Sequence, residues 1–122
     1  MPRPMIKAAL VFALGFAAAP ALADLPVVEN ATARPSAGGW QFSVTLSHPD
    51  TGWDHYADGW DVETEDGTRL GTRELLHPHV NEQPFTRSLS GVAIPAGVHR
   101  VYIRAHCKVD GWTKKRFEVT IP

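Results

Sequence analysis

The sequence predicts an all-β fold, a seven-stranded antiparallel sandwich that follows an amino-terminal signal peptide. Three observations support this prediction. Apolar and polar residues alternate with a period of two along several segments, most clearly at 40–47 and 99–109. Turn residues such as Pro, Gly, Asp and Asn separate these segments at intervals of roughly ten residues. Beyond residue 23 we find no apolar pattern with the period of a helix.

The first 23 residues have the three parts of a secretory signal peptide. Arg3 and Lys7 carry positive charge without any acid nearby, an apolar run follows at 8–19, and the small-residue motif ALA stands at 21–23. The apolar run is shorter than the roughly 20 residues that span a bilayer. We therefore expect cleavage before Asp24 and a periplasmic or secreted protein. Because no cysteine follows the cleavage site, we expect no lipid anchor, and because the apolar run is short we expect no membrane anchor in the mature form. An uncleaved membrane anchor is the alternative.

The mature chain, residues 24–122, is predicted to be one β-sandwich domain, in a monomeric or weakly associating protein. Cys107 is its single cysteine, so no internal disulfide can form. Stability must then come from packing or from a bound ion. We expect the Cys107 thiol to be buried and inert, with a role as a soft copper ligand as the lesser alternative.

Charge is unevenly distributed although the net charge of the mature chain is only about −3, which excludes a polybasic nucleic-acid binder. Seven acids lie between residues 50 and 66, and six basic residues lie between 100 and 116. We interpret the two segments as solvated strand faces of opposite sign. In this interpretation Asp61 and Glu63 are ordinary solvent-facing positions.

Seven strands are expected, near residues 25–33, 40–47, 56–64, 69–76, 85–94, 99–109 and 117–121. Glu65-Asp66-Gly67 is predicted to be a three-residue hairpin loop with Gly67 left-handed. This loop would set Val62 opposite Leu70. On the strand at 99–109, the alternation places His99, Cys107 and Val109 on the inward face.

Two sets of motifs carry a resemblance to known proteins. IPAGVHRVYIRAHCKVDGW at 94–112 resembles the E–F corner and F–G hairpin of fibronectin type III domains, within the immunoglobulin-like sandwiches. WDHYADGW at 53–60 and LLHPHVNEQPFTRSL at 75–89 resemble segments of a group of small exported bacterial proteins of unassigned function. The resemblance implies a periplasmic setting and the topology of that sandwich.

In this topology the B–C, C′–E and F–G loops emerge at one end of the sandwich and bring five of the six histidines together. His55, with the stiff pair His77 and His79 around Pro78, is a workable ligand set for Cu or Zn. The alternative is that these are ordinary surface-loop histidines without a metal.

The same end carries aromatic residues that favour ligand binding. Trp53, Tyr56 and Trp112, with Asn81 and Glu82 nearby, form a candidate surface for an unknown protein or small-molecule ligand. Packing over the end of the sandwich is the alternative for the two tryptophans. Trp40 and Trp60 have the inward parity of their strands and are expected in the core.

The sequence thus predicts an exported binding or accessory module, with transition-metal binding as the alternative function. No nucleophile elbow, phosphate loop or zinc-protease helix is present, and we expect no enzymatic activity.

Overall fold

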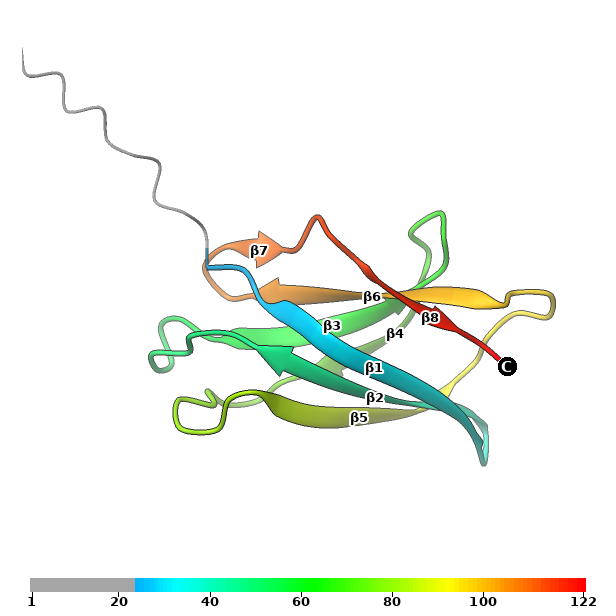
Figure 1. Ribbon diagram of the computed structural model, residues 1–122, viewed down its shortest axis with the longest axis horizontal. Coiled ribbons are helices and arrows are strands. Elements are labelled where there is room, and N and C mark those ends of the chain that lie inside the picture. The colour runs from blue at the N-terminus through cyan, green and yellow to red at the C-terminus, as the bar shows by residue number, and fades with distance from the viewer. Residues whose placement is uncertain (1–23) are drawn as a thin grey trace, which may run out of the picture.

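The computed structural model describes residues 24–122, which form two antiparallel β-sheets packed face to face (Figure 1). The predicted signal peptide, residues 1–23, lies outside the described residues. Within 24–122 the chain contains no helix, and therefore none long and apolar enough to cross a membrane. The strands are β1 (Val27–Ser36), β2 (Gly39–Ser47), β3 (Ala57–Glu63), β4 (Arg69–Glu74), β5 (Phe85–Val92), β6 (Arg100–Cys107), β7 (Gly111–Trp112) and β8 (Phe117–Thr120).

One sheet has three strands in the order β1-β2-β5, and the other has five. In the larger sheet β4, β3 and β6 are neighbours, and both β7 and β8 pair with the free edge of β6. Every pair is antiparallel. The predicted all-β sandwich is confirmed at this level.

The described residues contain eight strands rather than the expected seven, because the chain already pairs with β6 at Gly111–Trp112, before the expected last strand at 117–121, and residues 113–116 interrupt this pairing. The Thr113 hydroxyl causes the interruption: it accepts the Ala105 N–H at 3.3 Å and donates to the Lys115 carbonyl at 2.9 Å. A side-chain oxygen thus replaces a backbone carbonyl in the ladder. Short β7 and β8 continue on either side of this point.

The predicted strand at 99–109 is too long at both ends. Its core, β6, alternates as expected, but His99 and Val109 lie outside it and are exposed. Val109 is 61% exposed because the chain already turns after Cys107. The β3–β4 hairpin has the predicted loop, with Gly67 at φ +89°. A bulge at Leu70, however, places Val62 opposite Gly71.

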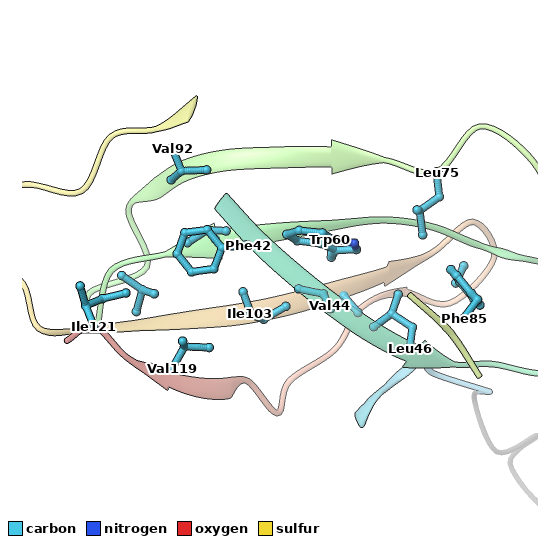
Figure 2. Close-up of a cluster of buried hydrophobic side chains, with 14 residues drawn as sticks. Phe42, Val44, Leu46, Trp60, Leu75, Phe85, Val92, Ile103, Val119 and Ile121 are labelled. Carbon is cyan, nitrogen blue, oxygen red and sulfur yellow. The ribbon is translucent and has the colours of Figure 1, made fainter. Parts of the chain in front are cut away.

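The core lies between the two sheets, where alternate residues of facing strands meet (Figure 2). Trp60 is fully buried, as predicted, whereas Trp40 is half-buried and packs against the edge of the core. Burial of each large apolar side chain stabilises the fold by about 1.5–3 kcal/mol. The largest buried apolar side chains are those of Phe42, Val44, Leu46, Trp60, Val62, Phe85, Val101 and Ile103.

Within the acidic segment, Asp61 and Glu63 are not the solvent-facing residues that the sequence suggested. Both lie on β3, which is a neighbour of β6, and they are only 1% and 6% exposed. Arg69 Nε and the Thr72 hydroxyl donate to Asp61 at 2.9 and 2.6 Å, and Arg116 lies 3.5 Å from Glu63. The error has a physical reason: β3 is central in its sheet, so side chains from β4 and from the segment before β8 reach its outer face and cover it.

Candidate metal centre at the loop pole

Three loops meet at one end of the sandwich, which we name the loop pole: residues 48–56, 75–84 and 108–110. Figure 1 shows the corresponding turns at the end where the blue start of the described chain also lies. Lys108 Nζ donates to the Trp53 carbonyl at 2.7 Å, which joins the first and third loops. The three loops that were expected to emerge at one end of the sandwich therefore do lie together.

Asp50 holds the loop pole together from its interior, with a side chain that has no exposed surface. Its Oδ1 accepts the Ala57 N–H at 2.9 Å and lies 2.5 Å from His48 Nδ1. Its Oδ2 accepts the His79 N–H at 2.8 Å. One carboxylate thus joins the loop at 48–56 to the start of β3 and to the loop at 75–84.

Next to Asp50, two histidines and the cysteine bring atoms that could bind a metal ion close together. Each of His48, His55 and Cys107 offers one donor atom, and these three atoms all lie within 4.8 Å of one another. The two imidazole rings meet edge to face with centroids 5.0 Å apart. His48 follows the end of β2, His55 belongs to the loop at 48–56, and Cys107 is the last residue of β6.

Cys107 is buried, as predicted, and burial raises the pKa of its thiol. Its inward position at the end of β6 brings it against imidazoles rather than aliphatic side chains. Asp110 Oδ2 lies 3.8 Å from its Sγ and 3.3 Å from His55 Nε2. The group therefore combines a soft sulfur donor, two imidazoles and an adjacent carboxylate, which are donor types that zinc and copper accept.

His48 contacts an acceptor at each ring nitrogen. Nδ1 faces the Asp50 carboxylate, and Nε2 lies 2.6 Å from the backbone carbonyl oxygen of Asp24. A neutral imidazole has one N–H and can donate to only one of these acceptors. With the proton on Nδ1, the carboxylate orients the ring as the usual partner behind a histidine ligand does, and an ion bound at Nε2 would displace the Asp24 carbonyl oxygen from that nitrogen.

The other two predicted metal ligands, His77 and His79, are not members of this donor group. Their rings lie side by side, with centroids 4.5 Å apart, and His77 is exposed. His79 is 4% exposed and stacks on Phe85 at 3.9 Å, and neither of its ring nitrogens has a hydrogen-bond partner. Burial, followed by the nearby charge of Arg87, lowers the pKa of His79.

The predicted ligand-binding residues are divided between two surfaces. At the loop pole Trp53 is 62% exposed and meets Tyr56 edge to face at 5.9 Å, while Asn81 and Glu82 are also exposed. Trp112 lies on the outer face of the larger sheet. It is half-buried there against His106, with Arg69 and Arg104 over its ring. The structure thus leaves Trp53 and Tyr56 as the aromatic pair of the loop pole.

The sequence analysis placed His48 at this end of the sandwich but did not select it as a ligand, and it favoured a buried, inert Cys107 over the alternative of a soft copper ligand. The spacing of His48 and Asp50, which are two residues apart around a proline, is the signal that was available. It allows a carboxylate to reach back to the ring of the histidine. The position of Cys107 at the very end of its strand depends on where the turn begins, which the alternation alone did not locate.

Comparison with known proteins gives one relative and no family. Over 79 residues, 63% of this chain, the sequence is 52% identical to a protein of Halomicrobium mukohataei named "Putative lipoprotein". The chain spans 38% of the length of that curated relative. No family model and no solved structure matches the chain.

Proposed function

We propose that the protein is an exported β-sandwich that binds one transition-metal ion, Zn²⁺ or Cu, at its loop pole. The observation that carries this proposal is the convergence of donor atoms from His48, His55 and Cys107 within 4.8 Å. The proposal takes up metal binding, the alternative function in the sequence analysis, and keeps the ligand His55, but it replaces His77 and His79 by His48 and Cys107.

The donor geometry is close to that of a bound ion. Zinc binds nitrogen at about 2.0–2.1 Å and thiolate at about 2.3 Å, so two nitrogens and one sulfur bound tetrahedrally lie about 3.3–3.6 Å apart. Donor atoms that are now up to 4.8 Å apart must therefore approach one another by about 1.2–1.5 Å. Rotation of the side chain of His55, which is half-buried whereas those of His48 and Cys107 are buried, would supply this movement.

The surroundings of the three donors support the same function. Asp50, itself held by two backbone N–H groups, fixes the ring of His48 as a carboxylate behind a histidine ligand does. Asp110 lies near both His55 and Cys107, where its carboxylate can serve as a further oxygen ligand.

We also propose a fold assignment and a location. The sheet orders β1-β2-β5 and β4-β3-β6, with β7 and β8 as two parts of one last strand, support a fibronectin type III-like sandwich. The name of the relative supports a location outside the cytoplasm and attributes a lipid anchor to that protein, contrary to our expectation of none. In this chain Asp24, not cysteine, follows the predicted cleavage site.

The metal site is tested by thermal melts of residues 24–122 under reducing conditions, with and without Zn²⁺, which is redox-inert. We expect Zn²⁺ to raise the melting temperature of the wild type and not that of Cys107→Ser or His55→Ala. His99→Ala is the matched control, because His99 is an exposed histidine beyond the opposite end of β6. Equal stabilisation of all four proteins would contradict the proposed site, as would stabilisation of none.

A second candidate function, recognition of a protein or small-molecule ligand, is supported by the exposed Trp53. The Trp53 ring contacts the Tyr56 ring edge to face. Lys108 Nζ lies 5.7 Å from the centre of the Tyr56 ring and donates a hydrogen bond to the Trp53 carbonyl. Exposed tryptophans on rigid loops are common binding residues. In this function Trp53→Ala abolishes binding of the ligand without lowering stability, whereas Cys107→Ser leaves binding unchanged.

A further inference from the structure

We infer that signal-peptide cleavage completes the metal site, because it converts the nitrogen of Asp24 into an α-amine that serves as a further ligand. The inference rests on the proposed function. It joins a prediction to an observation: the sequence predicts cleavage before Asp24, and the structure places Asp24 against a histidine of the donor group.

Asp24 reaches the donor group through its backbone. Its carbonyl oxygen lies 2.6 Å from Nε2 of His48, whose side chain is fully buried. Pro26 is also buried, which fixes the chain where it enters β1 at Val27. The amino end of the mature chain is thus held at the loop pole by packing on one side and by a histidine contact on the other.

Covalent geometry keeps the Asp24 nitrogen close to the same place. The nitrogen and carbonyl oxygen of one residue are separated by three bonds and lie about 3 Å apart. The Asp24 nitrogen therefore lies within about 6 Å of His48 Nε2. A rotation about the Asp24 backbone bonds brings both of its atoms to an ion bound at Nε2, where they close a five-membered chelate ring.

The chemistry of this nitrogen changes on cleavage. In the precursor it is an amide joined to Ala23, and its lone pair is delocalised into the carbonyl, so it is not a ligand at neutral pH. Hydrolysis adds water across this bond and leaves a carboxylate on Ala23 and an amine on Asp24. A free α-amine has a pKa of about 7.7–8.0 and can lose its proton to bind a metal ion near neutral pH.

Metal loading would therefore follow export. The precursor holds the two imidazoles and the thiol but lacks the amine, so its affinity for the ion is lower. Cleavage before Asp24 thus gives the complete set of ligands to the processed protein and not to its cytoplasmic precursor.

The test compares Zn²⁺ affinities, by competition with a chromophoric chelator, of residues 24–122 and residues 23–122. The longer form differs only by the native Ala23, which moves the free amine one residue away. We expect it to bind Zn²⁺ at least about tenfold more weakly, the loss typical of altering the surroundings of a metal ligand. The melting temperatures of the two metal-free proteins should agree, since no core contact changes.

A second measurement does not depend on the folding of the longer form. Selective acetylation of the α-amine of folded residues 24–122 should lower Zn²⁺ affinity to a similar extent, with Cys107→Ser as the variant that lacks the site. Equal affinity of the free, extended and acetylated proteins would overturn the inference and leave the proposed function intact. If none binds Zn²⁺, or if Cys107→Ser binds as the wild type does, the proposed function fails as well.

Discussion

The Asp50 carboxylate accepts the backbone N–H of His79 at 2.8 Å, across 29 residues of sequence. The contact is buried and joins the loop that carries His48 and His55 to the loop at 75–84. Because Asp50 also accepts the Ala57 N–H and contacts His48, the position of the donor group depends on this one side chain. Asp50 is therefore both a structural residue and the residue that positions the candidate site.

Truncation of Asp50 should strongly destabilise the fold. Asp50→Ala leaves the N–H groups of Ala57 and His79 buried without partners and removes the carboxylate beside His48. Removal of one partner from such a buried network costs about 3–5 kcal/mol. Urea unfolding of residues 24–122 measures this loss, with the exposed Asp54→Ala as the control, which should change stability by less than about 0.5 kcal/mol. Equal stability of the two variants would contradict the role of Asp50.

Buried His79 should make the protein less stable in mild acid. Burial lowers its pKa below 6.5, so the unfolded chain binds a proton at a pH where the folded protein still resists it. The stability that neutral His79 contributes is fully present above the unfolded pKa of about 6.5. It declines below that pH and is lost as the pH falls through the lower pKa of the folded protein. A single group gives a slope of at most about 1.4 kcal/mol per pH unit.

His79→Gln should flatten this dependence, because glutamine does not titrate. The measurement is the free energy of unfolding between pH 5 and pH 8 for the wild type, His79→Gln and His99→Gln. We expect the last variant to follow the wild type, since His99 is exposed. A slope in His79→Gln as steep as that of the wild type would assign the effect to other groups.

Most of the fold could be predicted because period-two alternation indicates both where the strands lie and which of their side chains face the core of the sandwich. Phe42, Val44 and Leu46 alternate with polar residues, and all three are in the core. The alternation does not show what covers the outer face, and this is why Asp61 was misjudged. Nor does it show where a side chain replaces the backbone, as Thr113 does when it divides the last strand.

The sequence predicted which loops meet, but the donor group that the structure brings together shares only His55 with the predicted ligands. The topology alone brings the three loops together, so His55 could be selected as a candidate ligand beside residues of the other two loops. The exchange of His77 and His79 for His48 and Cys107 depends on side-chain directions. His79 turns inward to stack on Phe85, and the turn after Cys107 begins early enough to leave its sulfur against His48 and His55. Such directions follow from packing, which no pattern of residues displays.

Processing should produce the amino terminus on which the further inference depends. Expression of the full chain with export should yield a protein that begins Asp24-Leu25-Pro26. Amino-terminal sequencing or intact mass measures the terminus. A terminus that remains at Met1 or Pro2 would contradict the prediction of a cleaved signal, and one a few residues beyond Asp24 would remove the proposed amine ligand.

Cys107 should react slowly with thiol reagents in the folded protein and more slowly still with Zn²⁺. The thiol is fully buried and burial raises its pKa, so the reagent can rarely reach Cys107 and little of the side chain is in the reactive thiolate form. It is the single cysteine, so the extent of alkylation by iodoacetamide, followed by mass, reports on this site alone. In urea the reaction should proceed at the rate of a free thiol.

At a concentration 100 times the dissociation constant of its complex with the protein, Zn²⁺ adds about 2.7 kcal/mol to the free energy of unfolding, which lowers the unfolded population about a hundredfold. Alkylation that requires unfolding should slow by the same factor in the wild type and not in His55→Ala. Fast alkylation of the folded, metal-free protein would contradict the burial of the thiol, and an unchanged rate with Zn²⁺ would contradict its role as a ligand.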